Sequence, residues 1–130
     1  MQSVFDFLKK AKTFYIATVE GNQPRVRPFG AINIFDGKLY TQTGKSKDVF
    51  KQIAANPKVE IFAFDSGTWL RVAATLVEDS RTEAQESMLE AFPQLKDRYK
   101  PNDGNNVVLY FKDAVAKFSS FGGEPKVVKF

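Results

Sequence analysis

Two basic segments of the sequence carry the residue types that would bind a phosphate group. The first is Tyr40-Thr41-Gln42-Thr43-Gly44-Lys45-Ser46-Lys47, where an alternating strand pattern leads into a turn and a predicted helix beginning at Ser46. Backbone N–H groups at a helix N-terminus, ammonium groups and hydroxyls are the donors that a phosphate accepts. The second is the basic strand Pro24-Arg25-Val26-Arg27-Pro28. Together the two segments indicate a bound phosphorylated cofactor.

The turn invites comparison with the nucleotide-binding phosphate loop, whose pattern is G-x-x-x-x-G-K-[ST]. Gly44-Lys45-Ser46 matches the end of that pattern, but Leu39 stands where its first glycine belongs. The predicted strand before the turn also belongs to a hairpin and not to a parallel sheet. A nucleotide-hydrolysing P-loop is therefore not expected, and solvated turn residues around an ordinary helix cap remain the simpler alternative.

The arginine strand has two interpretations as well. Arg25 and Arg27 share one face of a predicted strand, and they would be costly there unless they are exposed or paired. A solvent-facing strand edge explains them without any ligand. Pro28 and Gly30 favour an irregular stretch instead, because proline removes a hydrogen-bond donor and glycine removes a side chain. Such a stretch leaves backbone groups available to the edge of a flat heterocycle.

Composition limits the chemistry that this chain can perform unaided. The 130 residues are expected to form one domain, 1–130, and the net charge of +4 is spread without runs of like charge. Nucleic-acid binding is therefore not expected. The sequence has no His and no Cys. The commonest general base, thiolate nucleophile and transition-metal ligands are thus absent, so no metal site is expected and no catalytic residue can be named. A cofactor would carry any difficult reaction.

No segment indicates a membrane or an export signal. No apolar run approaches the roughly 20 residues of a membrane-spanning helix. The segment from Met1 to Ala11 is amphipathic and carries Lys9 and Lys10, so it lacks the continuous apolar core of a signal peptide. A cytoplasmic location is the expectation.

Hydrophobic periodicity and turn signals predict a mainly β domain with flanking helices. Helices are expected at Ser3–Ala11, from Ser46 to Ala55 and from a capping box at Ser80–Glu83 to about Phe92. Strands are expected at 13–19, 24–35, 38–43, 58–65, 69–79, 107–111, 114–121 and 126–130, some of them continuous with one another. Close spacing of short strands favours a six- to seven-stranded antiparallel barrel.

One turn fixes an expected pairing within that barrel. Asp36-Gly37 is a strong hairpin signal, so the strand from Pro24 to Phe35 should pair with the strand from Lys38 to Thr43. The arginines would then lie directly beside the threonines.

These segments, in this order, resemble the pyridoxamine 5′-phosphate oxidase-like superfamily. The resemblance rests on Pro24–Pro28, on Asp36–Thr41, on Thr43–Lys47 and on the helix ending at Asn56-Pro57-Lys58-Val59, and it covers most of the chain. It implies an FMN-binding split β-barrel, usually a homodimer with the flavin at the subunit interface. A small-molecule substrate or electron donor would be the other partner.

The resemblance also implies the residues of the cofactor site. Arg25, Val26, Arg27 and Pro28 would line the flavin ring and ribityl chain, and Tyr40, Thr41, Gln42 and Thr43 would flank the ribityl and phosphate groups. Lys45, Ser46 and Lys47 would hold the phosphate. Trp69 would reach the flavin, often from the partner subunit, although a core or interface aromatic explains it equally well.

Departures from the family pattern keep the activity open. Pyridoxamine phosphate oxidases are longer and use a C-terminal Trp and Arg, whereas no arginine follows Arg98 here. Nitroimidazole-reductase-like and haem-handling relatives often use a histidine, which this sequence lacks. Deazaflavin-using relatives share the barrel. A flavin-dependent oxidoreductase, a non-catalytic FMN-binding or sensing protein and a cofactor-free barrel therefore remain as alternatives.

Overall fold

The computed structural model describes all 130 residues of the chain. It contains eight strands, three α-helices and one 3₁₀ helix. The helices are α1 (Gln2–Ala11), α2 (Asp48–Ala55), α3 (Thr82–Ala91) and η1 (Pro93–Asp97). The strands are β1 (Phe14–Glu20), β2 (Gln23–Phe29), β3 (Asn33–Phe35), β4 (Lys38–Gly44), β5 (Lys58–Asp65), β6 (Thr68–Asp79), β7 (Asn106–Ser120) and β8 (Lys126–Lys129).

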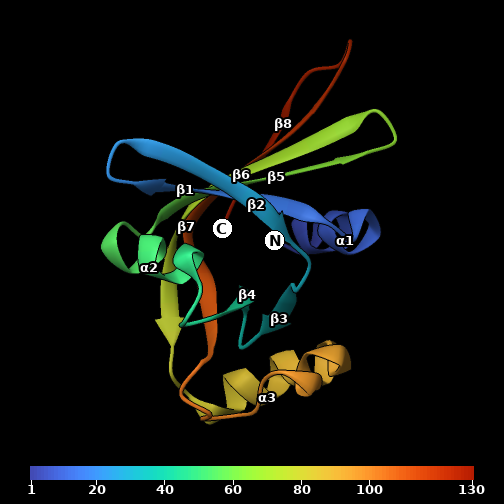
Figure 1. Ribbon diagram of the computed structural model, residues 1–130. Helices are drawn as coiled ribbons and strands as arrows, with labels where there is room; N and C mark the ends of the chain where they lie inside the picture. The colour runs from blue at the N-terminus through green and yellow to red at the C-terminus, as the bar shows by residue number, and fades with distance from the viewer.

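The strands form one antiparallel sheet that curls into a split barrel (Figure 1). The strand order is β2-β1-β5-β6-β7-β4-β3, and β8 pairs with β7 beside this path. The two edge strands, β2 and β3, follow each other in the sequence but do not pair. The barrel is therefore open between them, at the connection through Gly30, Ala31 and Ile32.

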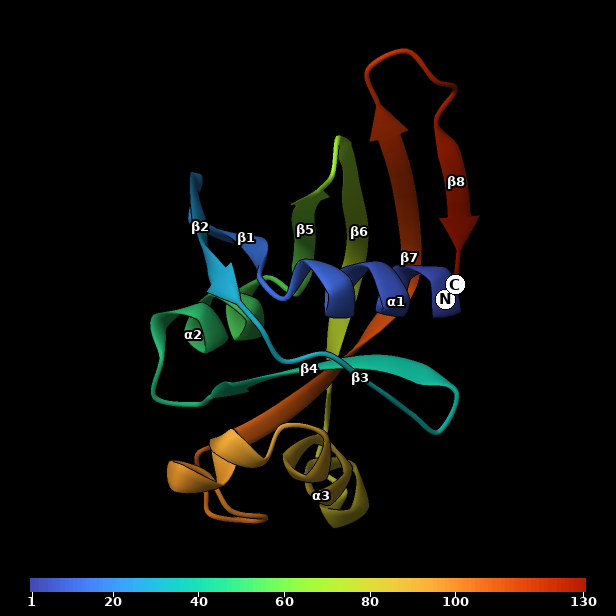
Figure 2. The ribbon, with the colours of Figure 1, turned by 90° about the vertical axis from the view of Figure 1, so that its right-hand side faces the viewer.

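The long strands β6 and β7 join the two halves of the barrel. They pair along most of their length, with a register shift between Ala73 and Thr75. The opposite edge of β7 pairs with β4 near Asn106–Tyr110 and with β8 near Val115–Phe118. Figure 2 shows this division, with β5 and β8 on one side of α1, with β3, β4 and α3 toward the other, and with β6 and β7 running past α1 from one side to the other.

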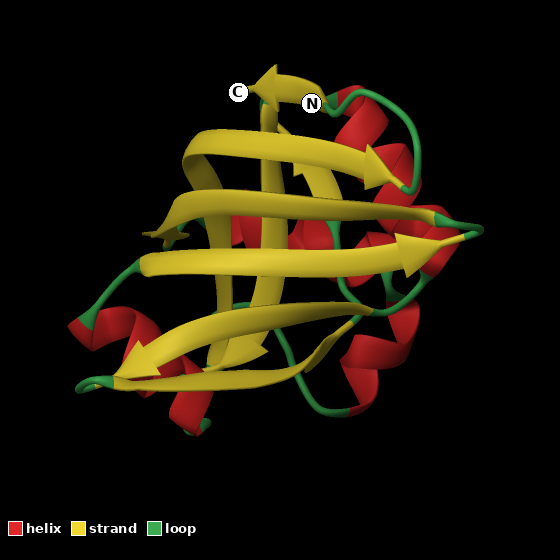
Figure 3. Cartoon of the chain, turned by 90° about the horizontal axis from the view of Figure 1, so that it is seen from above, coloured by secondary structure: helices red, strands yellow, loops and turns green.

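Alternating side chains of these strands fill the barrel with a continuous apolar core of 20 buried residues. The pattern of β5 is typical, because Val59, Ile61 and Ala63 point inward and the residues between them point outward. Helix α1 contributes Val4 and Leu8 to the same core. The helices lie around the sheet, as the view from above shows (Figure 3). None of them combines the length and the apolar character that a membrane crossing requires.

The predicted strand from Pro24 to Phe35 is the main error in the sequence-based fold. The structure divides it into β2 and β3, and β2 pairs with β1, not with β4. The Asp36-Gly37 hairpin is confirmed, with φ of 51° and 72°, but it joins only β3 to β4. The edge position explains β2, because its two prolines need no partner on the open side.

The predicted helix caps were also wrong, although the three helices exist. The residues that precede the helices are Met1, Lys47 and Arg81, and none makes a side-chain cap hydrogen bond. The expected capping box at Ser80–Glu83 does not form, and Ser3 and Ser46, where helices were expected to begin, do not cap them. Instead, Asp79 accepts a hydrogen bond from the Arg81 backbone N–H at 3.0 Å. The structure has eight strands where six to seven were expected, because the expected strand 24–35 is divided into β2 and β3.

Candidate functional site

A cleft of about 650 Å³ opens where the barrel is split. Its walls come from the end of β2, from β4, from the start of α2, from α1 and from the α3–η1 connection. This volume lies within the range of small-molecule binding sites. Fifteen residues line the cleft, and its charged members are all cationic: Lys9, Lys12, Arg27 and Lys47.

The β4–α2 corner of the cleft has the properties of an anion-binding site. The N–H groups of Asp48 and Val49 at the start of α2 have no acceptor within the chain. Thr43, 3% exposed, also lines the cleft, and its hydroxyl is buried without any hydrogen-bond partner. Lys47 adds a cation that forms no ion pair. A buried hydroxyl without a partner is costly, and a phosphate oxygen would satisfy it.

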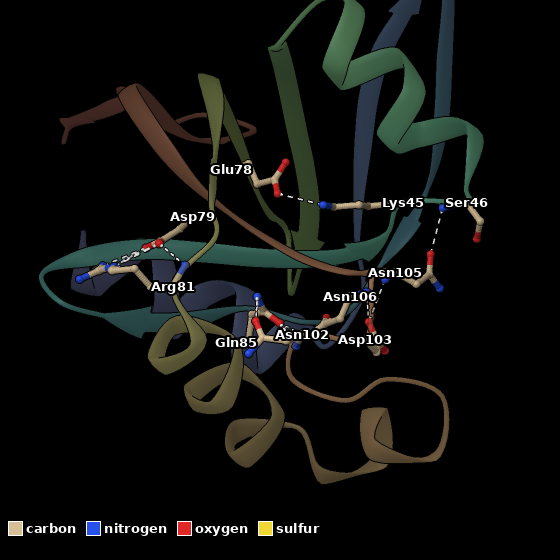
Figure 4. Close-up of polar contacts among 10 residues, drawn as sticks. All are labelled: Lys45, Ser46, Glu78, Asp79, Arg81, Gln85, Asn102, Asp103, Asn105 and Asn106. Atoms are coloured by element: carbon tan, nitrogen blue, oxygen red, sulfur yellow. Dashed lines mark hydrogen bonds and ion pairs between the residues drawn. The ribbon is translucent and has the colours of Figure 1, made fainter.

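The other two residues of the predicted phosphate turn face different groups. The ammonium of Lys45 lies 3.4 Å from the Glu78 carboxylate (Figure 4), and neither residue lines the cleft. The backbone N–H of Ser46 donates to Asn105 Oδ1 at 3.0 Å. The N–H of Lys45 donates to the Asn105 carbonyl at 2.7 Å. Of Lys45, Ser46 and Lys47, only Lys47 therefore lines the cleft.

The Asn105 contacts show that the loop before β7 holds the turn in place. Asp103 organises this loop by accepting hydrogen bonds from the backbone N–H groups of Lys100, Asn105 and Asn106, and Figure 4 shows the last two residues beside it. These hydrogen bonds lower the pKa of Asp103. The loop also packs closely on Gly44, where an added Cβ would lie 2.9 Å from the Tyr99 hydroxyl. The turn can therefore keep its conformation without a bound ligand.

Arg27 lines the cleft, but its guanidinium is already hydrogen-bonded to other groups of the chain. Its guanidinium donates to the Ile16 carbonyl at 3.1 Å, to the Thr18 hydroxyl at 2.8 Å and to the Gln52 side chain. Burial, assisted by the charge of Arg25, lowers its pKa. These contacts tie β2 to β1 and α2. Arg27 thus fixes the relative position of the two walls that flank the anion-binding corner.

The remaining predicted site residues separate into those at the cleft and those away from it. Pro28 and Gln42 line the cleft, and Arg25 and Val26 line a shallower hollow that adjoins it through Arg27 and Lys47. Tyr40 and Thr41 are buried and face protein groups, since their hydroxyls donate to Asp79 and to the Ala31 carbonyl.

Trp69 lies away from the cleft of its own chain. It is at the start of β6 and packs on Phe121, with ring centroids 4.9 Å apart. Its predicted contact with the flavin would therefore require a partner subunit.

Sequence reasoning missed the α1 and α3–η1 sides of the cleft. Lys9 and Lys12 are remote in sequence from the phosphate turn, and only the folded barrel brings them to it. The same is true of Phe92 and Leu95. A lysine pair near the end of an amphipathic helix was the only available signal, and solvent exposure explains such a pair equally well.

A pair of matched substitutions tests the unpartnered hydroxyl. Thr43→Val should stabilise the ligand-free protein by about 1 kcal/mol, because it removes a buried polar group that has no partner. Thr41→Val should destabilise it by about 1 kcal/mol, because the Thr41 hydroxyl does have an acceptor. Urea denaturation of both variants measures the two effects. A loss of stability in Thr43→Val would show that the hydroxyl is satisfied in the free protein.

The open antiparallel barrel with a cationic cleft at its split defines a split-barrel protein with a small-molecule cleft. Comparison with known proteins gives its family. The family profile described as Pyridoxamine 5′-phosphate oxidase matches residues 1–118. The chain belongs to this family, and its fold is the FMN-binding split barrel. No curated protein sequence matches the chain.

Solved structures give the same result. A NimC/NimA family protein from Clostridium acetobutylicum is 43% identical, with a TM-score of 0.96 over 100% of this chain and 92% of that one. General stress protein 26 from Bacillus anthracis shares the fold at 16% identity, with a TM-score of 0.76 over 99% and 97% of the two chains. So does a pyridoxamine 5′-phosphate oxidase-related, FMN-binding protein from Nostoc punctiforme, at 14% identity, with a TM-score of 0.65 over 99% and 93%.

Proposed function

We propose that this chain binds FMN in the cleft and acts as a flavin-dependent oxidoreductase on a small molecule. The observation that carries the proposal is the β4–α2 corner, where Thr43, Lys47 and Val49 all line the cleft: Thr43 has an unpartnered buried hydroxyl, Lys47 has no ion pair, and the N–H of Val49 is free. This donor set suits a phosphate dianion. The FMN-binding relative from Nostoc punctiforme supports the choice of cofactor.

In this proposal the chain's own residues bind and orient, and the cofactor supplies the chemistry. Thr43, Lys47 and the start of α2 would hold the phosphate. Backbone groups of the proline-containing edge strand β2 would face the ring, because they lie on the unpaired side of the sheet. When bound, FMN supplies hydride or electron transfer. No acid–base residue in the cleft stands out as catalytic.

The same site residues would serve a protein that stores or senses FMN without turnover, and one experiment separates the two functions. The purified protein should be yellow, and denaturation should release FMN. Under anaerobic conditions, NADH or NADPH should bleach the flavin absorbance of an oxidoreductase and leave that of a pure binding protein unchanged. A colourless protein that fails to quench the fluorescence of added FMN would contradict both functions.

We also propose that the chain forms a homodimer through the outer face of its sheet. Strand alternation leaves aromatic side chains on that face, including Tyr15, 45% exposed, and Phe64, 55% exposed. Tyr15 lies beside Phe62, and Phe64 lies beside Trp69, so the apolar side chains form neighbouring pairs. Exposed patches of this kind mark association surfaces. Sedimentation equilibrium should give twice the chain mass of 14.6 kDa, and a monomeric holoprotein would contradict this proposal.

A further inference from the structure

The cleft has a second cationic region that the phosphate corner does not use. Lys9 on α1 and Lys12 just after it line one side of the cleft, whereas Lys47 lines it from the position just before α2. Figure 1 places these two helices on different sides of β2. Neither Lys9 nor Lys12 forms an ion pair, and none of the fifteen lining residues is acidic. Two cations at this end therefore lack a counter-charge.

Apolar side chains lie next to these lysines. Leu8, Phe29, Phe92 and Leu95 line the same cleft, and Leu8 is only 1% exposed. The Lys9 ammonium lies 4.7 Å from the centre of the Phe92 ring, so the cation and an aromatic wall are in direct contact.

We infer that the α1 end of the cleft binds the substrate, and that the substrate is a small, apolar carboxylate, aromatic or unsaturated. The apolar walls would contact its body, and Lys9 and Lys12 would contact its carboxylate. The role of this ligand as a substrate rests on the proposed function, but its binding site does not require FMN.

The donors at this end favour a monoanion over a phosphate. Lys9 and Lys12 lie in and just after the last turn of α1, where the backbone presents carbonyl oxygens. The Lys12 N–H is already bonded to the Leu8 carbonyl at 3.0 Å, and the Thr13 N–H to the Ala11 carbonyl at 2.8 Å. The end of α1 therefore offers no free N–H beside these lysines, in contrast to the start of α2. The charged donors on this side are the two ammonium groups, which suits a carboxylate.

Benzoate and its neutral analogue benzamide test the inference by calorimetric titration at low salt. Benzoate should bind at least about tenfold more tightly than benzamide, because only benzoate carries the charge. Lys9→Gln and Lys12→Gln should each lower benzoate affinity by roughly fivefold and leave benzamide unchanged. Lys10→Gln is the matched control, because Lys10 pairs with Asp65 at 3.4 Å and does not line the cleft.

The outcomes distinguish this inference from the proposed function when the titrations are run with and without FMN. If benzoate binding depends on Lys9 and Lys12 but the protein never binds FMN, the carboxylate site is supported and the proposal of FMN as the cofactor is contradicted. Equal affinities for benzoate and benzamide, no benzoate binding, or an equal effect of Lys10→Gln would overturn the site. If Lys9→Gln or Lys12→Gln lowers FMN affinity and leaves benzoate affinity unchanged, these lysines belong to the cofactor site, and the inferred carboxylate site is contradicted.

Discussion

Replacing Lys47 with alanine is expected to weaken FMN binding by about 10- to 100-fold and to change riboflavin binding by less than about threefold. A charge-assisted hydrogen bond is worth about 1.5–3 kcal/mol, and each 1.4 kcal/mol corresponds to a factor of ten in affinity. Only FMN carries the phosphate, and Lys47 is the one lysine of the predicted turn that lines the cleft. Fluorescence-quenching titrations with both ligands measure the effect.

Two other lysines serve as controls for this result. Lys51 is exposed on α2, the helix that follows Lys47, and does not line the cleft. Lys51→Ala should therefore leave FMN affinity unchanged. Lys45→Ala should have a much smaller effect than Lys47→Ala, because the Lys45 ammonium faces Glu78. Equal losses in Lys45→Ala and Lys47→Ala, or equal losses for FMN and riboflavin, would contradict the position of the phosphate.

Replacing Asp79 with alanine is expected to destabilise the fold by about 2–3 kcal/mol. Asp79 accepts hydrogen bonds from the Tyr40 hydroxyl at 2.6 Å and from the Arg81 guanidinium at 2.8 Å, and so ties β4 to the start of α3. Tyr40 is 1% exposed, so its hydroxyl would lose a partner that water cannot easily replace. Thermal unfolding at pH 7 measures the loss. Glu78→Ala is the control and should cost less than about 1 kcal/mol, because Glu78 makes an exposed ion pair.

The same network predicts how stability depends on pH. The hydrogen bonds from Arg81, with a smaller contribution from the Tyr40 hydroxyl and against the effect of burial, hold the pKa of Asp79 far below the ordinary carboxyl range. A carboxyl group with a depressed pKa in the folded state stabilises the fold above its unfolded pKa of about 4. That stabilisation is lost as the pH falls toward the folded pKa. The difference in stability between the wild type and Asp79→Ala should therefore narrow below about pH 4, and a constant difference would contradict the assignment.

The stability of the fold at alkaline pH depends on Tyr40. Burial, with the hydrogen bond to Asp79, raises the pKa of Tyr40 to about 12. A raised phenol pKa stabilises the fold below the unfolded value of about 10, and this contribution is lost between about pH 10 and 12.

Local signals predicted the elements, while the pairing of β2 depended on the whole chain. The Asp-Gly turn, the proline after α2 and the alternation of β5 each specify structure within a few residues, and the structure confirms them. The Pro24–Phe35 segment was expected to be one strand, although Pro28 and Gly30 already indicated an irregular stretch within it. Its division follows from barrel closure. Strand β1 is the antiparallel partner of β2, whereas β4 pairs with β7 along one edge and with β3 along the other.

The candidate site shows the same limit. Thr43, Lys47 and Pro28 were found from local chemistry, and the structure brings them to one cleft. Lys45 was placed with them because sequence gives no direction to a side chain in a turn, and Glu78 comes from a distant strand. Lys9, Lys12 and Asn105 reach the site only through tertiary packing. Long-range contacts of this kind leave no periodic signal in a single sequence.

Parallel titrations of the wild-type protein with FMN and riboflavin test whether the cleft binds FMN through its phosphate. We predict one FMN per chain, quenched on binding, with an affinity at least about tenfold higher than that of riboflavin. Failure to bind FMN, or equal affinities for the two flavins, would contradict it.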